Sequence, residues 1–215
     1  MSIGEPMPRS KGQLPLSRDR ILGEAVALID RHGLDGLSMR RLAASLGVQP
    51  MAIYHYFSDK HALLHAAIDV ALGECDTSQA DRGLESVQKI CRSLREVSKR
   101  HPALFLAAMN HEALCRSELA IAEGILSALV GNGIDEQSAV RRYHTLITYV
   151  TGFCCDEITG LLFMSEQEAQ DLMSSEDAKA FPMVYRLRHH LSGADPDAEF
   201  ESGLALLLQG IEEAR

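Results

Sequence analysis

The stretch SMRRLAASLGVQPMAIYHYF at residues 38–57 has the pattern of two short helices joined by a tight turn. Ser38 is a favourable N-cap for the first helix, because its side chain can accept a hydrogen bond from an orphan backbone N–H. Gly47 suits the left-handed residue that ends a helix, and Pro50 is favoured at the first position of the helix that follows. The stretch therefore predicts a helix-turn-helix.

The second helix of this stretch carries side chains that cannot all be buried. Tyr54, His55 and Tyr56 are consecutive, so they point in different directions around the helix. Such side chains suit DNA, because a short helix in the major groove presents its first turn to base edges and its hydroxyls to phosphates. The alternative interpretation, that this turn has a purely structural role, remains open. The predicted DNA contacts are Ser38, Met39, Arg40, Gln49, Pro50, Met51, Ala52, Tyr54, His55, Tyr56 and Lys60.

The charges of the chain are distributed unevenly. The net charge is −9, but residues 1–60 carry eight Lys or Arg and six Asp or Glu, a net +2. Residues 61–215 carry thirteen Lys or Arg and twenty-four Asp or Glu, a net charge of −11. The basic part of the chain contains the predicted DNA-reading helix-turn-helix at 38–57, which we call the reader segment. This suits DNA binding, because phosphate contacts require positive charge, whereas DNA would repel the acidic remainder.

The composition of the 215 residues, 46% hydrophobic and 24% charged, is that of a globular protein. No apolar run reaches the roughly 20 residues that a membrane helix needs, and the N-terminal residues lack the apolar segment of a secretory signal. The five cysteines form no C-x-x-C pair and are expected to be reduced, mostly buried thiols. We therefore expect a cytoplasmic protein with no membrane partner.

The periodicity of the apolar residues predicts an all-α chain without internal repeats. Residues 1–16 are rich in Pro and Gly and are expected to form a flexible arm. A first helix should run from Ser17 to about His32, and a helix at about 59–74 should link a small N-terminal unit to a larger one. Acidic residues 165–180 are expected to be a mobile loop or frayed helix. Further helices are predicted at 84–100, 102–110, 116–130, 136–164, 178–191 and 197–213.

Two of these helices, at 139–163 and 200–211, are too apolar to lie on a surface. Such helices indicate a partner, and a second copy of the chain is the commonest one. A dimer would also place two readers about one turn of DNA apart, as a palindrome requires. The predicted interface residues are Tyr149, Gly152, Phe153, Leu204, Leu207, Leu208 and Ile211.

The sequence contains no constellation that indicates an enzyme, and we expect neither a metal nor a cofactor. His61 and His65 are four residues apart, but no third ligand follows at a regular spacing. Cys154 and Cys155 lie on an apolar helix and are either inert buried thiols or a redox sensor. Neither a Gly-rich phosphate loop nor a nucleophile motif is present.

Residues 17–64 resemble the DNA-binding domain of the TetR family of transcriptional regulators, with one departure at Gln49, where the family often has Ser or Thr. The matching residues are Ile21, Ala25, 33–38, Leu42–Ala43, Leu46–Gly47–Val48, 53–57 and 60–64. Residues from about 84 onward resemble more loosely the ligand-binding domain of the tetracycline-repressor type. The strongest part of that match is 200–212, together with 151–157.

After the flexible arm expected at 1–16, the resemblance implies a DNA-binding domain at 17–64 and a helical effector-binding and dimerisation domain at 65–215. It implies a dimeric four-helix bundle formed by the two apolar helices. Cys75 and Asp76 stand where a histidine of the drug and magnesium site is found in the tetracycline-repressor type, which argues against tetracycline itself.

The function expected from these observations is a ligand-responsive repressor that binds a palindromic operator as a homodimer. A small-molecule effector would enter an apolar pocket formed by the helices near 101–114 and 140–155. The alternative is a helical small-molecule sensor or carrier that does not bind DNA. The predicted pocket residues, which could also be plain core, are Phe105, Met109, Leu114, Thr145, Tyr149 and Phe153.

Overall fold

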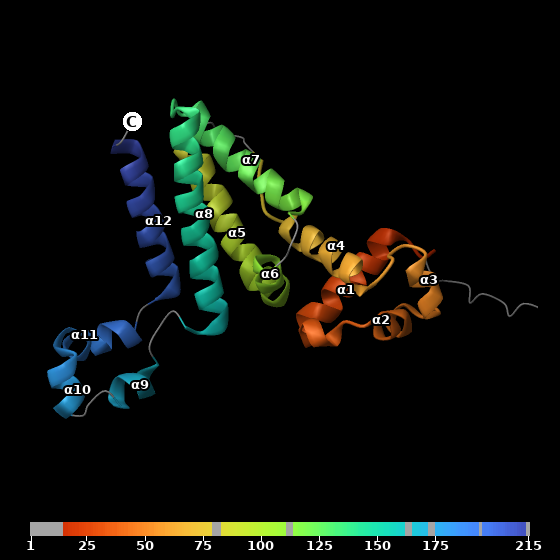
Figure 1. The fold of residues 1–215 in the computed structure, drawn as a ribbon, viewed down its shortest axis with the longest axis horizontal. Helices are drawn as coiled ribbons and strands as arrows, with labels where there is room; N and C mark the ends of the chain where they lie inside the picture. The colour runs from red at the N-terminus through yellow and green to blue at the C-terminus, as the bar shows by residue number, and fades with distance from the viewer. Residues whose placement is uncertain are drawn as a thin grey trace, which may run out of the picture.

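A computed structural model describes residues 15–78, 83–110, 114–161, 165–171, 175–193 and 195–213, so the arm predicted at 1–16 lies almost entirely outside the described residues. The described chain is all-α (Figure 1). Its elements are α1 (Arg18–His32), η1 (Leu34–Gly36), α2 (Met39–Leu46), α3 (Pro50–Tyr54), α4 (Lys60–Leu72), α5 (Leu84–Arg100), α6 (Pro102–Met109), α7 (Arg116–Gly131), α8 (Glu136–Thr159), α9 (Glu166–Asp171), α10 (Ser175–Ala180), α11 (Pro182–Ser192) and α12 (Pro196–Glu213).

Several helices, among them α1, α4 and α8, begin at side chains that accept from a backbone N–H of the first turn. Ser17 accepts from the N–H of Arg20 at 3.2 Å, and Asp59 accepts from Ala62 at 2.8 Å. Asp135 caps α8 in the same way. Because an N-cap offsets the lost hydrogen bonds of the first turn, these polar residues fix where each helix starts.

A small N-terminal unit is built from α1, α2 and α3 around a closed apolar core. Ile21, Leu42 and Ile53, one from each helix, are fully buried. The apolar face of α4 continues this core through Leu63, which is also fully buried. The short helices α2 and α3 are thus held against α1, and the opposite face of α3 is left to solvent.

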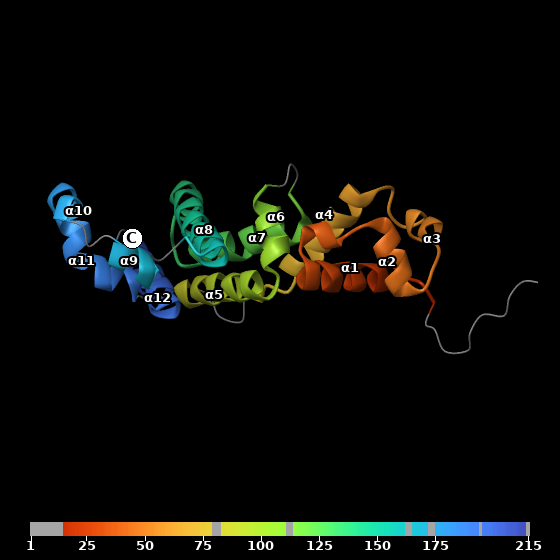
Figure 2. The same cartoon turned by 90° about the horizontal axis from the view of Figure 1, so that it is seen from below.

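The larger unit is arranged around α5, which packs against α6, α7, α8 and α12. Helix α4 packs against α1 on one side and against α6 and α7 on the other, so it connects the two units. Figure 2 shows the small unit at one end of the elongated molecule and the short helices α9–α11 at the opposite end. Helices α9 and α10 each pack against α11.

The structure corrects three predicted boundaries. Helix α8 ends at Thr159 rather than near residue 164, because Gly160 adopts the left-handed conformation that terminates a helix. The acidic segment 165–180, predicted as a loop or frayed helix, contains the two short helices α9 and α10. Helix α11 starts only at Pro182, which occupies its first turn. Among the described residues, no helix is both long and apolar enough to cross a membrane.

Candidate nucleic-acid interface and ligand cavity

The turn between α2 and α3 has the geometry that the sequence predicts. Ser38 caps α2 by accepting from the backbone N–H of Arg41 at 3.1 Å. Gly47 is left-handed, with φ 69° and ψ 32°, a conformation that costs little for a residue without Cβ. The N–H of Val48 donates to the carbonyl of Ala43 at 2.9 Å and closes the turn. Pro50 then opens α3.

The face of α3 opposite the core is exposed, together with the residues that flank it. Met51 is 67% exposed and Tyr54 is 44% exposed, whereas Ile53 between them is fully buried. Gln49 and His55 at the two ends of α3 are also exposed. The short helix α3 and the residues at its two ends therefore offer an amide, a thioether, a phenol and an imidazole to solvent, groups that can contact base edges and phosphates.

Basic side chains lie at the edges of this surface. Arg40 on α2 and Lys60 at the start of α4 are both exposed. Sequence reasoning missed Arg18, whose guanidinium donates to the carbonyl of Tyr56 at 3.2 Å and lies 4.3 Å from the centre of the Phe57 ring. The sequence shows only that a cation follows the Ser17 cap. Its contact with the end of the reader segment, 38 residues away, becomes visible only in the folded structure.

Several predicted DNA contacts have other roles in the structure. Met39 is only 8% exposed, so its assignment as a contact is wrong; it belongs to the core of the small unit. The hydroxyl of Tyr56 donates to the carbonyl of Leu16 at 2.8 Å, although the ring stays partly exposed. Pro50 and Ala52 are half-buried, on the flank of α3. These positions leave Gln49, Met51 and Tyr54 as the groups of α3 most open to a partner.

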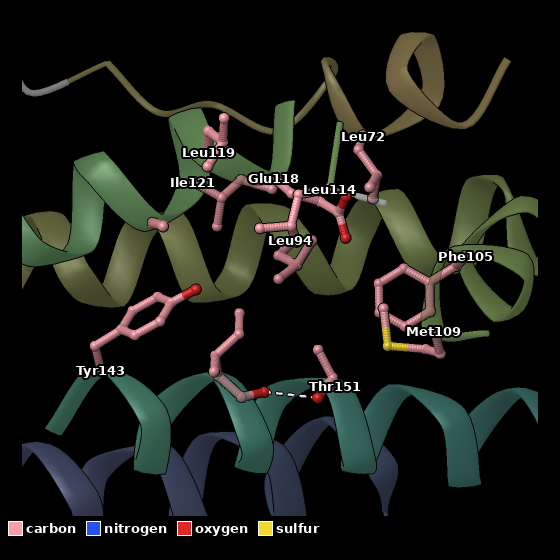
Figure 3. A pocket seen from close by; sticks show the side chains of 12 residues that line it. Leu72, Leu94, Phe105, Met109, Leu114, Glu118, Leu119, Ile121, Tyr143 and Thr151 are labelled. Atoms are coloured by element: carbon pink, nitrogen blue, oxygen red, sulfur yellow. Dashed lines mark hydrogen bonds between the residues drawn. The ribbon is translucent and has the colours of Figure 1, made fainter. Parts of the chain in front are cut away.

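A cavity of about 120 Å³ lies in the larger unit between α4, α5, α6, α7 and α8. Figure 3 shows side chains from these helices converging on it, with the phenol of Tyr143 projecting inward. The lining residues are Leu72, Leu94, Phe105, Met109, Leu114, Glu118, Leu119, Ile121, Ala122, Tyr143, Ile147 and Thr151. An apolar cavity with a few polar groups is the usual form of a small-molecule site.

Three of the six predicted pocket residues line this cavity: Phe105, Met109 and Leu114. On α8 the predicted residues and the residues that line this cavity differ in position by two. Thr145, Tyr149 and Phe153 lie outside the cavity, and Tyr143, Ile147 and Thr151 line it instead. Both sets have a spacing of four, but a shift of two residues turns a helix by about 200°, so the predicted set faces away from the cavity.

The predicted dimer residues of α8 and α12 pack against each other within one chain. The rings of Tyr149 and Phe153 lie 5.9 Å and 5.2 Å from the ring of Phe200 on α12. The Tyr149 hydroxyl donates to the Phe200 carbonyl at 2.9 Å. Leu204, Leu208 and Ile211 are buried in the same way. As exposed interface residues, Phe153, Leu204, Leu208 and Ile211 are therefore wrong, because their own chain covers them.

Other residues of α8 and α12 are open to solvent. Thr145, Thr148 and Gly152 are exposed on α8, and Leu206 on α12 is 68% exposed. Leu207 is half-buried beside them. A Cβ added at Gly152 would meet nothing within 4 Å. We call these residues, together with Gly210, the α8–α12 face; its small side chains leave room for close packing of another helix.

The four buried cysteines are free thiols in environments that suppress ionisation. Burial raises the pKa of Cys91 and of Cys115 to about 12, and that of Cys75 and of Cys154 to about 11. Because the thiolate is the reactive form, these residues are packing groups at neutral pH.

Comparison with known proteins finds two family models that match different parts of the chain. Residues 21–67 match the model of bacterial regulatory proteins of the tetR family, and residues 79–215 match the tetracyclin repressor-like C-terminal domain. The chain is 28% identical to the class A tetracycline repressor protein from transposon 1721 of Escherichia coli, over 93% of this chain and 92% of that protein. It is also 28% identical to the HTH-type transcriptional repressor DrrR1 of Streptomyces coeruleorubidus, over 94% and 80%.

Solved structures agree with these relatives. The TetR family protein ActR of Streptomyces coelicolor, in complex with (S)-DNPA, superposes with a TM-score of 0.81 and 28% identity, covering 94% of this chain and all of that one. The complex of ActR with actinorhodin gives a TM-score of 0.78 at 28% identity, over 94% and 99%. The second family model alone spans more than half of the sequence. The chain belongs to the TetR family of bacterial regulatory proteins.

Proposed function

We propose that this chain is a repressor that binds a palindromic operator as a homodimer and leaves the DNA when a small molecule occupies its cavity. Relatives named as repressors and the ligand complexes of ActR support this function. The observation that carries it is the exposed face of α3, with Met51 and Tyr54 held outward by the buried Ile53. A carrier that does not bind DNA is not favoured, because that role gives this face no partner.

In this proposal the exposed side of α3 enters the major groove. Gln49 hydrogen-bonds a base, Met51 contacts thymine methyl groups, and the Tyr54 hydroxyl reaches a phosphate. Arg40 and Lys60 neutralise backbone phosphates on either side, which also makes binding dependent on salt. Tyr56 acts indirectly, because its hydroxyl ties Leu16 to the end of the reader segment.

The α8–α12 face is the proposed dimer interface. Leu206 is a large apolar side chain left in solvent one turn before Gly210 on α12, and Gly152 is exposed on α8, which packs against α12. Pairing this face with the same face of a second copy would bury Leu206 under two-fold symmetry. Two α3 helices would then lie on the same side of the dimer, as reading of a palindrome requires.

Helices α4 and α6 are the proposed connection between cavity and reader. Leu72 at the end of α4 lines the cavity, and Lys60 at its beginning follows the reader segment. A ligand that displaces Leu72 would tilt α4 and alter the spacing of the two readers. Each good base contact contributes roughly 1–3 kcal/mol, so the loss of two in each half-site is enough to release DNA. The shift can be no larger than the difference in affinity of the ligand for the two conformations.

The test is fluorescence anisotropy with DNA from the region upstream of the gene, at two salt concentrations and against excess random DNA. We expect tight binding that resists competitor and weakens with salt. Tyr54→Ala should weaken it at least tenfold while the unfolding midpoint stays unchanged. Phe181→Ala, which removes another exposed aromatic ring, at the residue before α11, is the matched control and should bind like the original chain. Normal affinity of Tyr54→Ala would overturn its role as a contact.

A further inference from the structure

The lining of the cavity has one charged group among its described residues, the carboxylate of Glu118. Nine of the twelve lining residues are aliphatic, aromatic hydrocarbon or thioether side chains, and the other two polar groups are the hydroxyls of Tyr143 and Thr151. No Lys, Arg or His belongs to this described lining. The cavity is therefore an apolar space with a negative charge on one wall.

The position of Glu118 is fixed by the start of α7. One carboxylate oxygen, Oε2, accepts from the backbone N–H of Cys115 at 2.7 Å and completes a capping box. The first turn of a helix also favours a negative charge. The partners of this carboxylate among the described residues are the N–H and the thiol of Cys115, and no described cation pairs with it, so its negative charge is not offset where Glu118 lines the cavity.

The two hydroxyls complete the polar pattern. The phenol of Tyr143 extends into the cavity and no described residue hydrogen-bonds it (Figure 3). Burial, and then the nearby charge of Glu118, raise the pKa of this phenol, so it stays a neutral donor and acceptor. The Thr151 hydroxyl already donates to the Ile147 carbonyl at 2.7 Å and can only accept from a ligand. Acceptors thus outnumber donors in the lining.

We propose that the cavity takes a compact arylalkylamine in its protonated form, with the ammonium group against Glu118 and the ring among Leu94, Phe105 and Ile121. This inference rests on the proposed function only in treating the cavity as the effector site. An ammonium group is a donor without acceptor capacity, and it matches a wall of acceptors. A carboxylate ligand would instead place a second negative charge beside Glu118, with no described cation to offset it.

The size of the cavity limits the ring system. Its volume of about 120 Å³ is comparable to the engineered cavity of roughly 150 Å³ that binds benzene. A single ring therefore fits without rearrangement. Met109 and Leu114 at the exposed edge are the side chains that would move for a larger ligand, since both are partly open to solvent and Met adapts readily.

The experiment compares three probes of one shape, benzylamine, benzyl alcohol and benzoate, by isothermal titration calorimetry against the full-length protein. We expect benzylamine to bind about tenfold more tightly than benzyl alcohol, with benzoate weakest, because a hydrogen bond to a charged group is the stronger kind. Glu118→Gln should remove this preference for the amine and leave the alcohol unchanged. Gln can keep the capping box, so the variant should fold.

Glu123→Gln is the matched control, since Glu123 is an exposed carboxylate on the same helix outside the cavity lining. Tyr143→Phe gives a second variant in the cavity and should weaken the alcohol as well as the amine. Equal affinity of the three probes, an unchanged preference in Glu118→Gln, or no binding of any probe would overturn the proposal. Operator binding is measured separately on the same protein. Its loss would contradict the proposed function, whereas failure of the probe series alone would contradict only the assigned ligand class.

Discussion

The Nδ1 atom of His101 lies 2.9 Å from a carboxylate oxygen of Asp30, which joins the N-cap of α6 to the last turns of α1. His101 is 8% exposed. Its Nε2 is 3.3 Å from an oxygen of Glu74 at an angle that makes no hydrogen bond, and Arg100 pairs with the same carboxylate. Because α6 also carries Phe105 and Met109 into the cavity, one short helix contacts both the ligand site and the reader unit.

Replacing Asp30 should therefore destabilise the junction of the two units. Asp30→Ala leaves the Nδ1 of a buried imidazole without its partner, which costs about 1–3 kcal/mol of unfolding free energy. Urea denaturation measures the change. Asp35→Ala removes an exposed carboxylate from η1 and should change the stability by less than about 0.5 kcal/mol. Equal stability of the two variants would show that the His101–Asp30 contact contributes nothing.

Gly203 should not tolerate a side chain. A Cβ built there lies 2.3 Å from the Tyr149 hydroxyl oxygen and 2.6 Å from the ring carbon that bears it. Gly203→Ala must displace either the tyrosine or α12, and we expect a loss of about 1–3 kcal/mol in unfolding free energy.

The control for this variant is Gly23→Ala in α1, where an added Cβ meets nothing within 4 Å. There the better helix propensity of Ala should raise the stability by up to about 1 kcal/mol. Thermal or urea denaturation of the two variants should give shifts of opposite sign. A shift of the same sign in both would contradict the packing of Tyr149 on α12.

The proposed dimer interface predicts that a charge at position 206 separates the two copies. Leu206→Arg would bury an unpaired guanidinium in the α8–α12 face, so sedimentation velocity should show monomers with weak operator affinity. Ala205→Arg places the same charge on an exposed position one residue away, about 100° around α12, and should stay dimeric. A dimeric Leu206→Arg would show that the interface lies elsewhere.

Acid should weaken the attachment of α12. Lys99, followed by Arg95, lowers the pKa of Asp197 below its ordinary value of 3.8, and Arg92 lowers that of Glu201 below 4.5. The unfolded chain lacks these contacts and takes up protons at the ordinary values. The stabilisation is therefore complete above those values and is lost as the pH falls through the lower values of the folded state.

The double variant Asp197→Asn/Glu201→Gln tests this pH dependence. Its unfolding free energy should lie below that of the original chain at pH 7, and the difference should shrink as the pH falls below about 4. The side chain of Asp197 is 71% exposed and that of Glu201 is 41% exposed, so salt should reduce the difference as well. A difference that is independent of pH would show that the ion pairs do not stabilise α12.

The sequence was sufficient for the reader segment because local rules decide it. Ser38, Gly47 and Pro50 determine the start, stop and restart of two helices without reference to distant residues. The burial of Ile53 follows from the same pattern. Met39 could not be placed in this way, since a residue at the first position of a helix turns inward or outward according to what packs beside it.

For the larger unit, the sequence predicts where the helices lie but not which side of each helix packs against which neighbour. Helix α8 is apolar around much of its circumference, so its periodicity does not distinguish the side that meets α12 from the side that lines the cavity. The sequence therefore places Tyr149 and Phe153 at the cavity, whereas in the structure their rings pack against Phe200. Glu118 was missed because the sequence shows only an acidic residue in a first turn, a common capping position.

The most direct test of a sequence-specific regulator is to incubate the purified protein with fragmented genomic DNA and to sequence the fragments that it retains. We predict that one palindromic motif is enriched, with half-sites about one helical turn apart. Tyr54→Ala should lose that enrichment. Retained fragments with the composition of the input DNA would contradict sequence-specific binding and would leave the cavity as a ligand site without an operator to control.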